Sequence, residues 1–168
     1  MKNNKYFFKI LFFLIFFFNF NFLLSNEFEF KASKIETTNN NSKIKGTGGV
    51  EVNDKKDLII TGQQFEYNKL NSILVVNDNV VIKDNLNNNI IKTEKIIFNK
   101  ISNIINTANK TIIELDSGYL IESSSLIYDR NLNIITSDNK TFVTDPYENK
   151  LTMRAFQYST INRMLSAQ

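Results

Sequence analysis

The chain repeats itself at intervals of about thirty residues, and the repeated positions carry the apolar residues of β-strands. The first position of each copy holds Phe30, Ile60, Ile91, Ile121 and Leu151, and an aromatic position follows in the later copies at Tyr67, Phe98, Tyr128 and Tyr158. The copies align with one another as far as Leu165 when a single-residue shift is allowed between the second and third copies. A repeat of this length indicates a stacked architecture, in which each unit buries its apolar face against its neighbours.

Within one copy the pattern predicts strands and turns. Two groups of apolar positions have opposite parity, so a bulge or corner must lie between them if both face inward, near a small residue such as Gly62. One turn is expected at Asn68-Lys69 and its equivalents, and a second near Gly48, Asp78, Asn109 and Asn139. The sequence therefore predicts three short antiparallel strands per repeat, and no segment has the period of an amphipathic helix. Such repeats stack either as a flat solenoid or as a V-shaped pair of sheets.

Residues 1–26 have the layout of a secretory signal peptide. Lys2, Lys5 and Lys9 precede an apolar stretch from Ile10 to Leu24, and the small residue Ser25 follows it. Cleavage there would leave a mature N-terminus near Asn26 or Glu27. The uninterrupted apolar run is shorter than the roughly 20 residues that a membrane-spanning helix needs. A retained N-terminal anchor is the alternative.

Composition excludes several functional classes. The chain has 20 Lys and Arg against 17 Asp and Glu, and three of the Lys lie in the predicted signal peptide, so residues 27–168 are balanced and no nucleic-acid partner is indicated. It contains no Cys and no His, which excludes thiol or imidazole catalysis, the usual zinc sites and disulfides. The turn carboxylates fall at scattered repeat positions rather than in a convergent catalytic pair: Asp54, Asp57, Asp78, Asp84, Asp138 and Asp145. We therefore expect a protein that is not an enzyme and needs no metal or cofactor.

The repeat resembles the OstA-like lipopolysaccharide-transport proteins. The units that carry the resemblance begin Ile60-Thr-Gly-Gln-Gln-Phe-Glu-Tyr and Leu120-Ile-Glu-Ser-Ser-Ser-Leu-Ile-Tyr, each followed by a strand such as Val80-Val-Ile-Lys-Asp. Gly49 keeps the glycine of the family's G-x-V-x-I pattern, whereas Asn79 and Lys110 replace it. The resemblance extends from Phe28 to Leu165. It implies an all-β fold for residues 27–168, namely an open β-jellyroll of tandem three-strand repeats in the periplasm of a Gram-negative cell.

The resemblance also implies a function and partners. Family members carry or bridge lipopolysaccharide toward the outer membrane, with its acyl chains shielded in an apolar groove, and they include the soluble LptA, the anchored LptC and the periplasmic domain of LptD. The fifth repeat lacks its third strand after Leu165. This fits the N-terminal domain of an LptD-like assembly protein, or an LptA-like bridge whose open edge receives a homologous jellyroll by strand addition, head to tail.

The repeated inward positions are the predicted lipid-binding residues. They are Ile35, Ile44, Val50, Val52, Phe65, Tyr67, Leu74, Val80, Ile82, Ile96, Phe98, Ile105, Ile113, Leu126, Tyr128, Ile135 and Val143. The alternative is that these side chains fill a closed core, as in a structural β-solenoid or an adhesin-like surface protein.

Overall fold

The computed structural model describes residues 28–167, which form a single antiparallel sheet of 14 strands. The strands are β1 (Glu29–Thr38), β2 (Lys43–Asn53), β3 (Leu58–Asn68), β4 (Ile73–Asp84), β5 (Asn89–Asn99), β6 (Ile104–Ala108), β7 (Thr111–Glu114), β8 (Leu120–Ser123), β9 (Ile127–Asp129), β10 (Ile134–Ser137), β11 (Thr141–Thr144), β12 (Lys150–Met153), β13 (Phe156–Ser159) and β14 (Met164–Ala167). No helix capable of crossing a membrane occurs in this part of the chain. The predicted signal peptide lies outside the described residues.

The strands β1 to β5 are long, and the sheet bends along a line of irregularities. The register of neighbouring strands shifts between Thr61 and Gln64 of β3 and between Asn77 and Val80 of β4. Side chains before the shift in β3, such as Ile60, and after it, such as Phe65, are both buried. The bulge therefore changes the parity so that both halves of the strand face one interior. This confirms the corner predicted near Gly62.

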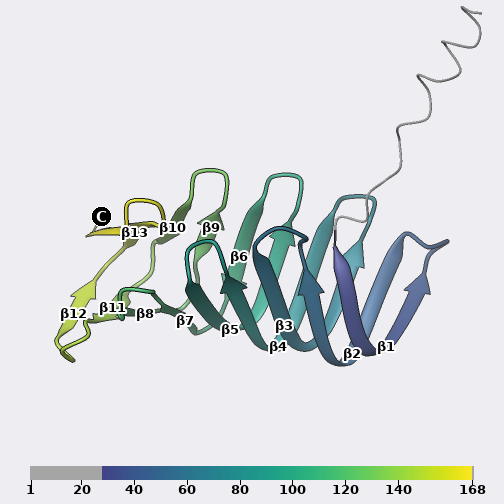
Figure 1. Ribbon diagram of the computed structural model, residues 1–168, viewed down its shortest axis with the longest axis horizontal. Coiled ribbons are helices and arrows are strands. Elements are labelled where there is room, and N and C mark those ends of the chain that lie inside the picture. Colours follow the sequence, from purple (N-terminus) through teal and green to yellow (C-terminus); the bar gives the residue numbers. More distant parts are fainter. Residues whose placement is uncertain (1–27, 168) are drawn as a thin grey trace, which may run out of the picture.

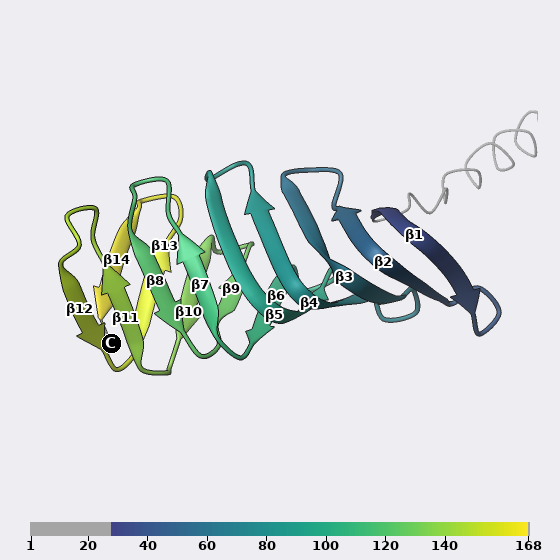
Figure 2. The ribbon, with the colours of Figure 1, turned by 90° about the horizontal axis from the view of Figure 1, so that it is seen from below.

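Beyond β5 the sheet divides into two walls. The second half of β5 pairs with β6, whereas Ile90–Lys92 pairs with β7. We call the layer that continues through β6, β9, β10, β13 and β14 wall 1, and the layer of β7, β8, β11 and β12 wall 2; each includes the adjoining halves of β1 to β5. The two walls form an open V, with one layer behind the other when viewed from below (Figures 1 and 2). The predicted fold class, an open all-β jellyroll of tandem antiparallel repeats, is confirmed.

The prediction of three strands per repeat is wrong in one detail. The second turn of each repeat does not reverse the chain; it is the corner at which the chain passes from one wall to the other. Gly48, Asp78 and Asn109 lie at these corners with φ of 82°, 65° and 67°. Gly, Asn and Asp are favoured at left-handed corners and at hairpin turns alike, so the sequence signal is the same for both. In the first two copies the repeat is a pair of long bent strands, as in β3 and β4, whereas the third copy is divided at the corner into the three strands β5, β6 and β7.

The hairpin loops gather along the two free margins of the V, opposite the corners (Figure 1). Lip 1, the margin of wall 1, comprises residues 39–42, 69–72, 100–103, 130–133 and 160–163. Lip 2, the margin of wall 2, comprises residues 54–57, 85–88, 115–119 and 145–149, together with the strand residues next to them. We call the gap between the lips the mouth and the line of corners the spine. Asn-rich runs supply tight turns here, since Asn39, Asn40 and Asn41 all have positive φ.

Candidate functional site

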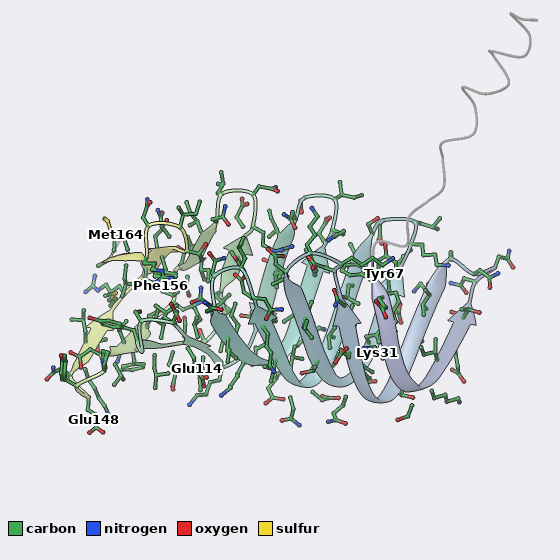
Figure 3. The ribbon with its side chains drawn as sticks, in the orientation of Figure 1. Lys31, Tyr67, Glu114, Glu148, Phe156 and Met164 are labelled. Atoms are coloured by element: carbon green, nitrogen blue, oxygen red, sulfur yellow. The ribbon has the colours of Figure 1, made fainter. Side chains whose placement is uncertain are left out.

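The interior of the V is apolar along its whole length. All the predicted lining residues are buried except Ile44, which is partly buried, and Ile35, which is 46% exposed. Several have no exposed surface at all: Val52, Leu74, Ile82, Ile96, Phe98, Ile105, Ile113 and Ile135. The repeat thus brings the predicted set together on the facing surfaces of the two walls. Figure 3 shows two members of this buried interior, Tyr67 and Phe156, toward opposite ends of the molecule.

Further interior residues were absent from the predicted set. The first position of the repeat, at Ile60, Ile91 and Ile121, is fully buried in wall 2. This position and the small residue two positions later lie on the same face of the strand. The alternation along the strand could therefore have identified the first position as an interior one. The interior also contains Phe28, Leu58, Val76, Leu115, Met153, Phe156 and Tyr158. Phe28 and Leu58 both stand two positions before the first repeat position, at Phe30 and Ile60, and both are buried, so this recurrence could have identified them.

An aromatic cluster fills the interior near β1. The rings of Phe30 and Phe65 stack with centroids 4.6 Å apart, and Phe28 meets Tyr67 and Phe98 edge to face at 5.2 and 5.6 Å. Such edge-to-face pairs add stability beyond the area they bury. A pocket of about 370 Å³ opens beside this cluster, lined by Phe28, Glu29, Phe30, Ile35, Thr37, Ile44 and Lys55. The apolar interior is therefore accessible at the β1 end of the sheet.

Hydroxyl groups close the spine. The Oγ1 atom of Thr111 lies 3.0 Å from that of Thr93 and 2.8 Å from that of Thr107, and all three residues are buried. In the next repeat Ser123 and Ser137 form the equivalent contact at 2.8 Å. At these two corners the hydroxyl groups satisfy one another, and most side chains between the spine and the mouth are apolar.

Buried charges bridge the mouth near its middle. Arg130 of lip 1 donates to Asp54 Oδ2 of lip 2 at 3.0 Å and also contacts Asp57. The Lys100 Nζ lies 3.5 Å from the same Asp54 oxygen. Burial alone would raise the pKa of Asp54, but the backbone N–H groups of Leu58 and Lys56 and the charges of Arg130 and Lys100 hold it below its ordinary value. Burial lowers the pKa of Lys100.

Two further contacts cross the mouth toward the C-terminal end. The Tyr128 hydroxyl of wall 1 donates to Asp84 Oδ2 at 2.8 Å, and Asn87 donates to the same oxygen at 2.7 Å. Burial raises the pKa of Tyr128, and the nearby Asp84 carboxylate raises it further, so the phenol stays a donor. Arg163 of lip 1 lies 3.1 Å from Asp116 of lip 2, in an exposed pair.

The arrangement suits the binding of an apolar molecule. The carboxylates Asp54, Asp57, Asp84 and Asp116 are engaged by donors from the opposite lip, as described above. Within residues 28–167 no group of three or more His, Cys, Asp or Glu side chains is placed to hold a metal ion. The chemistry that the interior offers is burial of hydrocarbon between two apolar walls.

Comparison with known proteins identifies the fold. No protein-family model matches the chain, and no curated protein matches it by sequence. Among solved structures it matches the crystal structure of LptH, described as the LptA homologous periplasmic component of the conserved lipopolysaccharide transport device from Pseudomonas aeruginosa. The TM-score is 0.53 at 14% identity, and the match covers 61% of this chain and 75% of LptH. The chain therefore has the LptA-like jellyroll fold.

Proposed function

We propose that this protein is a periplasmic carrier that shields the acyl chains of lipopolysaccharide during transport to the outer membrane. One observation supports the proposal above all. An uninterrupted apolar interior lies between two walls that are joined at the spine and face each other across the mouth. LptH, a component of a lipopolysaccharide transport device, has the same fold.

The energetics suit a carrier that passes its ligand onward. Each acyl methylene that leaves water contributes about 0.8 kcal/mol, and this gain offsets part of the cost of parting the walls. A ligand must displace contacts between the walls, because residues such as Leu74, Ile96 and Ile105 are already fully buried. The carrier is not an enzyme in this proposal and uses no cofactor, so energy for transport comes from its partners.

The sheet edges provide the route to a partner. Within the described sheet β1 pairs only with β2 at one edge, while β12 and β14 lie at the ends of the two walls. Unpaired strand edges accept strands of another chain. We propose that a homologous jellyroll, or another copy of this chain, docks there head to tail. Both an LptA-like bridge and the N-terminal domain of an LptD-like assembly protein would work in this way.

A second candidate function is a structural β-solenoid or adhesin-like role, in which the interior is a permanent core. The complete burial of the interior side chains favours it. The two functions differ in whether lipid ever reaches the interior.

Photocrosslinking at adjacent isoleucines of β5 tests the proposal. Ile96 is fully buried between the walls, whereas Ile97 is 40% exposed on the outer face. We expect a photoreactive residue at Ile96 to crosslink to purified lipopolysaccharide, and the same residue at Ile97 to remain at background. Equal labelling at both positions, or none at Ile96, contradicts the carrier and leaves the structural role.

A further inference from the structure

We propose that the mouth of the jellyroll is an ionic gate, in which lip 2 supplies carboxylates and lip 1 supplies donors that hold the walls together. The inference deepens the proposed function and rests on it for the identity of the ligand. It assigns Asp54, Asp84, Arg130 and their partners as gating residues that control access to the interior.

The first observation is the sidedness of the contacts. Lip 2 and the strand ends beside it provide the carboxylate acceptors at the three bridged places, namely Asp54 with Asp57, Asp84, and Asp116. Lip 1 and its strand ends provide the donors to these carboxylates, namely Arg130 with Lys100, Tyr128, and Arg163. One longer contact runs the other way, from Asn87 Nδ2 of lip 2 to the Tyr128 hydroxyl at 3.4 Å. The bridging partners of Asp54, Asp57 and Asp84 are 44 to 76 positions away in the sequence, so the fold, not local structure, creates the pairs.

The second observation is the depth of the first contact. The Arg130 side chain is 7% exposed and that of Asp54 is 0% exposed, so this ion pair is buried. The Arg130 guanidinium lies 5.8 Å from the centre of the Phe98 ring, and Lys100 Nζ lies 5.2 Å from that of Phe28. The cations therefore form a cover directly above the aromatic part of the interior. A buried ion pair is costly to break, because one charge is left without a partner.

The third observation is the shape of the mouth along its length. The two walls continue beyond β5 as separate layers, so parting the lips breaks no strand pairing there. Toward the C-terminal end the lips diverge, with Glu148 of lip 2 and Met164 beside lip 1 on opposite margins (Figure 3). The bridging contacts thus hold together two layers that no strand pairing joins beyond β5. Opening them would let the walls rotate apart about the spine.

The gate accounts for how a filled interior can accept hydrocarbon. When the lips part, an amphiphile can place its chains between the walls while its head stays at the mouth. The opposed charges of the lips then close the cover again over the chains.

Thiol labelling measures the opening without any lipid, and the chain's lack of Cys makes each introduced thiol unique. Ile105→Cys places a thiol in the interior near lip 1, and Val76→Cys places one beside the spine, next to the bulge of β4; both positions are 0% exposed. Each is combined with Arg130→Gln and treated with a water-soluble maleimide. We expect labelling at position 105 to accelerate on the order of a hundredfold and at position 76 far less. Equal acceleration at both, which is global unfolding, or no change at position 105 would overturn the gate.

A charge exchange at the exposed contact provides a second test that spares the fold. Arg163→Asp places two carboxylates opposite each other, and adding Asp116→Arg restores an ion pair with reversed polarity. With the thiol at Ile135→Cys, we expect the single change to raise the labelling rate by roughly twofold to fivefold, and the exchanged pair to restore it. A rate that the exchange does not restore counts against the gate. Because neither assay contains lipid, their failure is distinct from failed crosslinking at Ile96.

Discussion

At the scale of single residues, Asp54 connects the two lips. Its Oδ1 atom accepts from the backbone N–H groups of Lys56, Asp57 and Leu58, which fixes the β2–β3 loop. Its Oδ2 atom faces Arg130 and Lys100 of the other lip. One carboxylate thus shapes a turn and joins two walls. Its charged form persists although it is buried, because backbone N–H groups and two cations stabilise the negative charge.

The depressed pKa of Asp54 makes a prediction about acid. The charged groups around it are Lys56 and Asp57 of its own loop and Lys100 and Arg130 of lip 1. Because the folded-state pKa lies below the ordinary 3.8, the ionised carboxylate contributes stability that is complete above that value and is lost as the pH falls through the folded-state pKa. We expect the difference in unfolding free energy between wild type and Asp54→Asn to be constant above about pH 5 and to shrink below about pH 4.

Urea unfolding at a series of pH values measures this difference. Asn keeps an oxygen that can accept from the loop N–H groups, so the comparison isolates the charge. A difference that is independent of pH down to pH 2, or that disappears above pH 5, would show that Asp54 is not held in its charged form.

At the scale of elements, the corner gives the fold its shape. Each long strand passes from one wall to the other at a bulge. The polar groups at the bulge are buried, so they need hydrogen-bond partners from neighbouring side chains. Gly62 lies at such a corner, where an added Cβ would come within 2.6 Å of Val76 Cγ1. At the corner formed by β5, β6 and β7, Thr93, Thr107 and Thr111 share hydrogen bonds. These contacts hold the two halves of the sheet at a fixed angle.

Removal of one hydroxyl from this corner should therefore destabilise the fold. Thr111→Val keeps the shape of the side chain but leaves the hydroxyls of Thr93 and Thr107 without one partner, and we expect a loss of about 1–2 kcal/mol in urea unfolding. The matched control is Thr136→Val on the outer, half-exposed face of β10, where we expect a change within about 0.5 kcal/mol. Similar losses for both variants would show that the corner hydroxyls do not matter.

The strands and the inward positions could be predicted from the sequence because they depend on local alternation. Parity placed Phe65, Ile96 and Ile113 on one surface, and the parity change near Gly62 required a corner. The role of Asp78 was misjudged, since Asp favours hairpin turns and left-handed corners equally. The residues that bridge the mouth could not be recognised, because Asp54 and Arg130 look like ordinary turn residues. Only the bend of the whole sheet brings their loops together.

At the scale of the whole molecule, the stacked repeats form one continuous apolar interior. Each repeat covers the apolar face of the one before it, and the β1 end exposes part of that face at the pocket beside Ile35 and Ile44. Another jellyroll that adds its edge strand to β1 would cover this pocket. It would also align the two interiors, which extends the apolar path.

Association through this end can be tested with a pair of matched substitutions. Ile35, 46% exposed, lies on the β1 edge beside the pocket, whereas Ile97, 40% exposed, lies on the outer face of β5 in the middle of the sheet. If copies of the mature chain stack through β1, Ile35→Lys places a charge in the buried contact and should weaken association by tenfold or more, on the order of the loss of one buried Ile. Ile97→Lys should change the association constant by less than about twofold, because that face remains in water.

Sedimentation equilibrium over a range of concentrations measures the association of both variants, with circular dichroism confirming that each variant is folded. Equal weakening by the two variants would place the interface elsewhere, and a wild type that stays monomeric at every concentration would leave a different jellyroll as the partner to be tested with the same pair.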